Sequence, residues 1–343
     1  MATWFDESRL DDEAALASAD VRLRELAEFG ARVRREATEA APGIAAAVDA
    51  ARDAARPRAI VAAGPDSRLL RAVLEPWCPV PFVAWPGSAL PGWAGGLDLV
   101  VVLAPDGSDR ATAAAVAEAL RRGSQVVVAC PAGSLVARHA EGRWSTIVPT
   151  VTRDQLATAV VVLEYLDQVG LGPRADHSDV AKALDDVAIA CSPHRDIAVN
   201  PGKMLAMAMA DANPVVWGGS SLAARAARRV SETIRRASRR SAIAGDAEHL
   251  LPLIEAAKPR DVFDDPFAEG GGEPRPMLLI FDDGADDPVV HEDRGRLRDA
   301  AAAHGVRVET VTAVGDTEVA RYASLVLSGR YGAEYLRLGL VDD

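Results

Sequence analysis

Residues 97–123, LDLVVVLAPDGSDRATAAAVAEALRRG, contain an apolar run of strand length, a turn rich in Pro, Gly and Asp, and an Ala-rich helical stretch. A strand that is apolar at every position has both faces buried, as in a parallel sheet that helices cover on both sides. Similar apolar runs occur in the same half at RAIVAAG (58–64), VPFVAW (80–85), SQVVVAC (124–130) and STIVP (145–149). This alternation predicts an α/β domain.

The same alternation restarts in the second half of the chain. NPVVWGGSS (213–221) precedes the helical stretch LAARAARRVSETIRRAS (222–238), and two more strands are predicted at PMLLIFDD (276–283) and VRVETVTA (306–313). The segment AKPRDVFDDPFAEGGGEPRP (257–276) is rich in Pro, Gly and Asp and predicts a loop. The halves resemble a distant tandem repeat, with a parallel sheet of about five strands in each.

Helical patterns occupy the N-terminus and the middle of the chain. Pro42 and Gly43 are expected to separate two N-terminal helices, and DQLATAVVVLEYLDQVG (154–170) is apolar nearly all round, which predicts burial between domains. We therefore expect two three-layer α/β/α domains with a helical N-terminus. The expected divisions are N-terminal helices (1–56), a first domain (57–150), an interdomain helix (151–185) and a second domain (186–343).

The composition excludes several classes of protein. The chain has 343 residues, 49% of them hydrophobic, which is enough for full cores and argues against disorder. The net charge of −12 argues against a broad nucleic-acid surface, which requires a basic face. No apolar run reaches the length of a membrane span, the N-terminus is acidic, and three separated cysteines form no metal or disulfide pattern. We expect a cytoplasmic protein with no membrane contact.

The clearest loop is Gly218-Gly219-Ser220-Ser221, between a predicted strand and a predicted helix. Glycines let the backbone approach a ligand closely, and N–H groups at a helix N-terminus favour an anion such as phosphate. The alternative is an ordinary strand-to-helix turn, in which Ser serves as a helix cap. The pattern alone leaves both interpretations open.

The order of these turns resembles the double sugar-isomerase (SIS) domain proteins, and within them the bifunctional phosphoglucose/phosphomannose isomerases. The resemblance extends over nearly the whole chain. It rests on PVVWGGSSLAARAARRV (214–230), on the C-terminal SLVLSGRYGAEYLRLGLVDD (324–343), and on two first-half turns, AAGPDS (62–67) and APDGSD (104–109). It implies a phosphosugar isomerase of carbohydrate metabolism that binds its substrate at these turns, needs no cofactor or metal, and forms a homodimer.

The resemblance also implies roles for individual residues. Glu232 is the candidate base for proton transfer between C1 and C2, although the helix register places Arg236 at the family's Glu position. His249 is the candidate for ring opening, and the family's C-terminal Lys has no counterpart. The implied substrate-binding residues are Gly218, Gly219, Ser220, Ser221 and Arg229 in the second half, and Gly64, Ser67, Gly107, Ser108 and Thr112 in the first half.

Acidic residues occupy the first-half turns where the family carries hydroxyl groups. Asp106 and Asp109 stand at two such positions, and Asp66 lies on the neighbouring turn. A carboxylate ~5 Å from a phosphate charge costs about 3 kcal/mol at an effective dielectric constant near 20, whereas a helix terminus supplies at most about 2 kcal/mol. Two hypotheses follow: a glucose/mannose-6-phosphate-type isomerase, or a phosphosugar-binding sensor or scaffold that has lost the chemistry.

Other chemistry-bearing residues favour ordinary structural roles. The remaining histidines show no metal-ligand spacing and are expected at the surface or at helix caps, and FDDGADDP (281–288) lacks the calcium-loop pattern. The helix at 225–240 carries a concentration of arginines that forms either a solvated face or an anion-binding or self-association surface. No metal site is expected.

Overall fold

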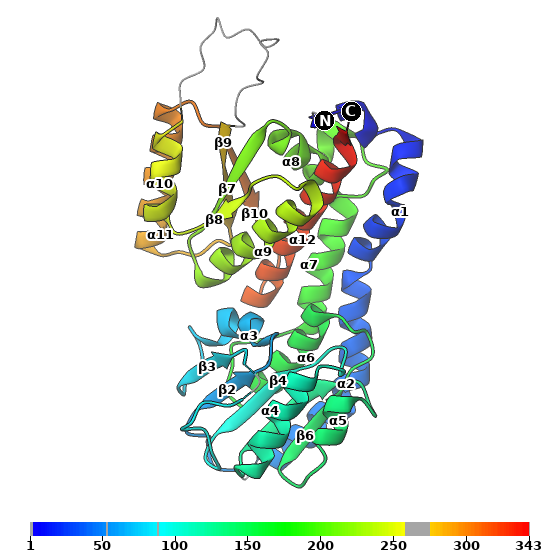
Figure 1. Ribbon diagram of the computed structural model, residues 1–343, viewed down its shortest axis with the longest axis vertical. Coiled ribbons are helices and arrows are strands. Elements are labelled where there is room, and N and C mark those ends of the chain that lie inside the picture. Colours follow the sequence, from blue (N-terminus) through cyan, green and yellow to red (C-terminus); the bar gives the residue numbers. More distant parts are fainter. Residues whose placement is uncertain (1–2, 53, 88, 258–274, 343) are drawn as a thin grey trace, which may run out of the picture. The chain divides into compact units, whose positions relative to one another are not determined.

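The computed structural model describes residues 3–52, 54–87, 89–257 and 275–342 (Figure 1). The chain divides into two compact units. The first unit combines Met1–Glu28 with Ala183–Asp343, and the second unit is Phe29–Lys182. Each unit contains a parallel sheet with helices on both faces, so the predicted α/β class is confirmed.

The unit Phe29–Lys182 is built on a five-stranded parallel sheet in the order β3-β2-β4-β5-β6. Its strands are β2 (Ile60–Ala63), β3 (Phe82–Trp85), β4 (Leu99–Leu103), β5 (Gln125–Cys130) and β6 (Ser145–Pro149). Every residue of β2 and β4 is buried, because these strands lie inside the sheet and are covered on both faces.

Helices on both faces bury these strands. The helices are α2 (Phe29–Ala51), α3 (Ser67–Leu74), α4 (Arg110–Arg121), α5 (Leu135–His139), α6 (Gln155–Gln168) and the start of α7 (His177–Ala190). Helices α4 and α5 pack on one face through a cluster that includes Val100, Val102 and Val128, and α6 contacts β4 and β5. Within α6, the residues from Ala157 to Leu163 are all buried, as its apolar pattern predicts.

Helix α2 differs from the prediction of a break at Pro42 and Gly43. The helix runs through both residues to Ala51, and the preceding helix α1 (Glu13–Ala27) ends before Phe29. Tertiary packing explains the difference: a Cβ on Gly43 would lie 2.8 Å from the ring of Pro149 in β6, so only Gly allows this close approach. The buried Glu36 carboxylate also ties α2 to the backbone N–H groups of Val151 and Thr152, at 2.9 and 2.8 Å.

The unit Met1–Glu28 plus Ala183–Asp343 contains a four-stranded parallel sheet in the order β10-β9-β7-β8. The strands are β7 (Ala212–Gly218), β8 (Ile243–Ala244), β9 (Arg275–Asp282) and β10 (Val308–Thr312). The expected fifth strand is absent from the described residues, because the chain passes from β10 into the long helix α12 (Glu318–Gly339). Residues 258–274 of the predicted loop lie outside the described residues.

Two groups of helices cover the two faces of this sheet (Figure 1). Helices α10 (Ala247–Glu255) and α11 (Pro288–Ala303) pack on one face, against Val215, Trp217 and Ile280. The other face carries α8 (Pro201–Met209), α9 (Ser221–Ser238) and α12, and α12 packs on both α8 and α9.

A short N-terminal segment is anchored in the same unit. Strand β1 (Thr3–Phe5) pairs antiparallel with β11 (Leu340–Asp342), and η1 (Glu7–Leu10) and α1 follow it. The fully buried Lys203 of α8 donates hydrogen bonds to Asp11 (2.5 Å) and to the carbonyls of Pro193 and Arg195 (both 2.9 Å). All three ammonium protons are therefore used in holding the N-terminal segment, which accounts for a buried lysine.

Candidate functional site

The turn between β7 and α9 contains Gly218, Gly219, Ser220 and Ser221. A Cβ on Gly218 would lie 2.3 Å from the backbone carbonyl carbon of Ala223, so this position requires Gly because the helix backbone crosses it closely. Ser220 caps α9, and its hydroxyl accepts a hydrogen bond from the N–H of Ala223 at 3.0 Å. Both features explain the motif as a strand-to-helix turn.

Asp283 lies beside this turn, which the sequence pattern did not indicate. It follows β9, the neighbour of β7, and parallel strands bring their carboxyl ends to one edge. The Ser220 hydroxyl donates to the Asp283 carboxylate. Arg321 of α12 donates to the backbone carbonyls of Asp283 (3.2 Å) and Asp316 (3.0 Å) and holds this loop in place. The edge of the second sheet therefore carries both an anion-favouring helix terminus and a carboxylate.

Arg229 and Glu232 lie further along α9 and form an ion pair with each other at 3.8 Å. Arg229 is eight residues beyond the start of α9, about 12 Å along the axis at 1.5 Å per residue. Arg225 is closer to the turn, and its buried Nε has no hydrogen-bond partner. Burial raises the pKa of Tyr322 in α12, while the charges of Arg225 and Arg229 beside it act in the opposite direction. Arg225 therefore lies closer than Arg229 to the start of α9 along the helix.

His249 and Glu232 do not come together within this unit. His249 is exposed on α10, which packs on the face of the sheet formed by Val215 and Trp217. Glu232 lies on α9, which covers the opposite face (Figure 1). Within one chain, the two candidate residues therefore lie on helices that cover different faces of the sheet.

The first-half turns meet at the edge of the other sheet. Gly64 follows β2, and a Cβ on it would lie 3.0 Å from Oγ1 of Thr112 in α4. Asp109 caps α4 and accepts hydrogen bonds from the Thr112 backbone N–H (2.7 Å) and hydroxyl (2.6 Å). These bonds lower the pKa of Asp109 and keep it charged at neutral pH. Ser67, at the start of α3, is 1% exposed and its hydroxyl has no partner.

Asp66, Asp106, Gly107 and Ser108 complete this edge. Asp66 accepts a hydrogen bond from the Gln155 side chain at 2.5 Å, which links the first turn to α6. Gly107 has φ of 64° and packs against Ser134, the cap of α5. Asp106 and Ser108 are both exposed. The edge therefore combines the exposed Ser108 with the carboxylates of Asp66, Asp106 and Asp109.

One group of potential metal ligands lies elsewhere in the same unit. Ligand atoms of Glu164, Asp176 and His177 all lie within 4.8 Å of one another. Glu164 accepts hydrogen bonds from the backbone N–H (2.7 Å) and Nδ1 (2.6 Å) of His177, and Asp176 accepts from the N–H of Ser178 at 2.8 Å. These bonds cap the first turn of α7, so the group has a structural explanation in the helix terminus.

Each of the two sheets therefore carries turns at the carboxyl ends of its strands. Residues 198–339 match the family described as the bacterial phosphoglucose isomerase C-terminal SIS domain. No curated protein matches the chain in sequence. The resemblance to the phosphosugar isomerase family of SIS proteins is therefore supported by a family match over residues 198–339.

Solved structures share the fold across nearly the whole chain at low sequence identity. Tagatose-6-phosphate ketose/aldose isomerase from Escherichia coli has a TM-score of 0.61 at 12% identity and covers 92% of this chain and 93% of its own. The C-terminal domain of glucosamine-fructose-6-phosphate aminotransferase from Francisella tularensis has a TM-score of 0.62 at 12% identity, with 94% and 97% covered. Among the described helices, none combines the length and the apolar character that a bilayer crossing requires.

Proposed function

We propose that the protein is phosphosugar-isomerase-like and binds a sugar phosphate, but that its isomerase activity is absent or very low. The separation of Glu232 and His249 on opposite faces of the second sheet is the observation that carries this proposal. The ion pair between Glu232 and Arg229 adds support, because it engages the carboxylate that would act as the base. The molecule would then act as a sensor or scaffold for carbohydrate metabolism.

The alternative is an active isomerase of the glucose-6-phosphate/mannose-6-phosphate type. The match of residues 198–339 to the bacterial phosphoglucose isomerase family favours this alternative. An active isomerase would require that Glu232 leaves its ion pair with Arg229, or that other residues of the molecule supply the base and the acid. A coupled assay that interconverts fructose 6-phosphate with glucose or mannose 6-phosphate separates the two functions, because the sensor binds the sugar without turnover.

The start of α9 is the proposed position for the phosphate group. Ser221 and Leu222 are the first residues of this helix, where N–H groups and the helix dipole favour an anion. Arg225, one turn further along, adds a positive charge. In the other unit, the candidate contacts for sugar hydroxyl groups are Gly64, Ser67, Ser108 and Thr112, of which Ser108 is exposed.

Substitution of Asp106 tests whether the first-half turn limits the binding of a sugar phosphate. Asp106 is exposed at a turn where the family has a hydroxyl, and its charge would oppose a phosphate bound at this turn. We expect Asp106→Ser to increase the thermal stabilisation given by fructose 6-phosphate without restoring turnover, because Glu232 and His249 stay apart. Rapid turnover by the wild-type protein would contradict the proposal of lost activity, whereas equal stabilisation of both proteins would remove Asp106 as the obstacle to binding.

We also propose that the protein is a cytoplasmic homodimer. Cys78, Cys130 and Cys191 are all unpaired, and the latter two are buried, which suits a reducing compartment. The dimer is implied by the family resemblance, in which the partner chain lies near each site. Light scattering that gives a single 36.1 kDa species at micromolar concentration would contradict the dimer.

A further inference from the structure

The edge of the second sheet at β10 is open. The first sheet has the order β3-β2-β4-β5-β6, and the second sheet repeats this order as β8-β7-β9-β10 without the last strand. In the first sheet, β6 pairs with β5 along Val126–Cys130 and closes the corresponding edge. The equivalent position beside β10 has no strand in the described part of the chain.

The backbone of β10 presents hydrogen-bonding groups to this open edge. The Arg307 carbonyl accepts from the Leu278 N–H at 2.9 Å, and the Ala313 N–H donates to the Asp282 carbonyl at 2.8 Å, so the odd-numbered residues of this segment face β9. In a parallel pair of strands, the even-numbered residues that alternate with them direct both their N–H and their C=O away from the partner strand. The N–H and C=O of Val308, Thr310 and Thr312 therefore point away from β9 and can pair with a further strand.

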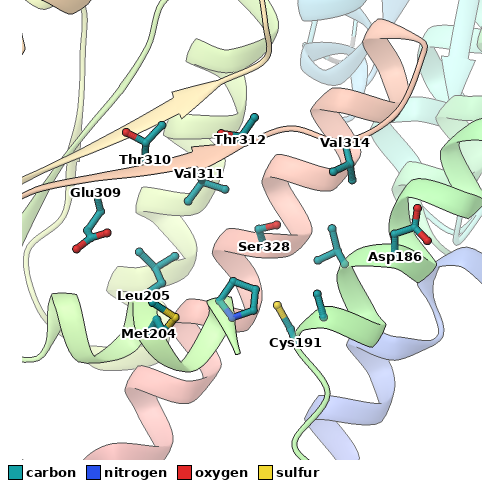
Figure 2. Close-up of a pocket in the computed structure, with 13 residues that line it drawn as sticks. Asp186, Cys191, Met204, Leu205, Glu309, Thr310, Val311, Thr312, Val314 and Ser328 are labelled. Atoms are coloured by element: carbon teal, nitrogen blue, oxygen red, sulfur yellow. The ribbon is translucent and has the colours of Figure 1, made fainter. Parts of the chain in front are cut away.

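A cavity of about 310 Å³ lies along the same edge. Glu309, Thr310, Val311 and Thr312 all line it, and since successive strand residues face opposite sides of a sheet, the cavity must meet β10 at its edge. Figure 2 shows β10 on one side of the cavity, with Ser328 of α12 and Met204 and Leu205 of α8 beside it and Asp186 and Cys191 on the side of α7.

The shape of the cavity limits what can occupy it. The wall opposite β10 is formed by α7, through Asp186, Val187, Ala190 and Cys191. A second sheet edge from another copy of the chain would need the space that α7 fills, whereas a single extended segment needs only the width of one strand. Main-chain pairing of this kind gives affinity, and pockets for alternate side chains give specificity.

The lining of the cavity defines the side chains of the occupant. Apolar residues dominate it, and Met204 and Val314 at the cavity are 48% and 41% exposed, although both are large and hydrophobic. The only charged lining residues are Asp186 and Glu309, and Glu309 is also paired with Arg307 at 2.7 Å. An extended segment with β-branched apolar residues and basic ends complements this surface. At the corresponding edge of the first sheet, the strand is β6 (STIVP), which contains the β-branched residues Thr, Ile and Val.

We propose that the edge of β10 binds an extended peptide segment of a partner protein as a fifth strand of the second sheet, with its apolar side chains in the 310 Å³ cavity. This interaction surface is separate from the proposed sugar site, and it does not depend on whether the protein binds a phosphosugar.

The test uses a fluorescein-labelled seven-residue peptide of alternating valine and threonine with a lysine at each end, measured by fluorescence anisotropy. Thr310→Pro removes an N–H that points to the open edge without removing a bond to β9, and proline is tolerated at such edge positions. We expect it to weaken binding about tenfold, since one peptide carbonyl loses its donor. The matched control Thr310→Val keeps the N–H and should change binding by less than about twofold. Ala190→Trp should abolish binding by filling the cavity.

Several results would overturn the proposal. One is a wild-type protein that does not bind the peptide at about 1 mM, and another is equal binding by the wild type and Thr310→Pro at unchanged melting temperatures. A peptide with N-methylated amides should also fail to bind, because it cannot pair with β10. If the peptide does not bind and Ala190→Trp converts a dimer to a monomer, the occupant is a second copy of the chain and the peptide proposal is wrong.

Discussion

Replacing Asp283 by Asn should increase the affinity of the protein for fructose 6-phosphate about tenfold. The Ser220 hydroxyl contacts the Asp283 carboxylate, so a phosphate at the adjacent start of α9 would lie roughly 5 Å from that charge. At an effective dielectric constant near 20, such a pair repels by about 3 kcal/mol. Asp283 is partly exposed, and solvent screening reduces the expected repulsion to about 1.4 kcal/mol, or tenfold in affinity.

Thermal shift measures this change directly. At a sugar phosphate concentration of about ten times the wild-type dissociation constant, the ligand stabilises the wild type by about 1.4 kcal/mol and the variant by about 2.7 kcal/mol. For a domain of roughly 150–250 residues, the difference raises the melting temperature by about 3–5 °C. Isothermal titration calorimetry on both proteins checks the affinity itself.

Asp286→Asn is the matched control for Asp283→Asn. It removes the same charge from the same loop, but the Asp286 side chain is 98% exposed and forms only a 4.0 Å contact with His291. Equal gains in the two variants would mean that net charge, and not the carboxylate beside Ser220, limits binding. No gain in either variant would refute the assignment of the phosphate to the start of α9.

Three further changes test how the structure is held together. Lys203→Met should cost about 1–3 kcal/mol in urea unfolding, because Asp11 and two carbonyls lose their donor. Gly218→Ala should lower the melting temperature, since its methyl group would overlap the backbone of Ala223. Burial raises the pKa of Cys191 from 9.0 to about 12, so the unfolded state ionises first and stability should fall as pH rises from 9.0 toward 12, less steeply in Cys191→Ala.

The sequence by itself determined the elements and their class. The apolar runs at 97–104 and 124–130 contain β4 and β5, because strands buried on both faces cannot carry polar side chains at alternate positions. The turn at 218–221 was also identified from its glycines and serines. These features can be predicted because they depend on local composition and on the apolar pattern that burial requires, and both can be read from the sequence.

Only the tertiary structure decided which residues meet. Asp283 and Ser220 are 63 positions apart and become neighbours because β7 and β9 are adjacent in the sheet. Glu232 and His249 are close in sequence and yet lie on opposite faces, because the chain crosses the sheet through β8 between their helices. The order of strands is set by packing between distant segments, so local patterns could suggest the candidate residues but not their arrangement.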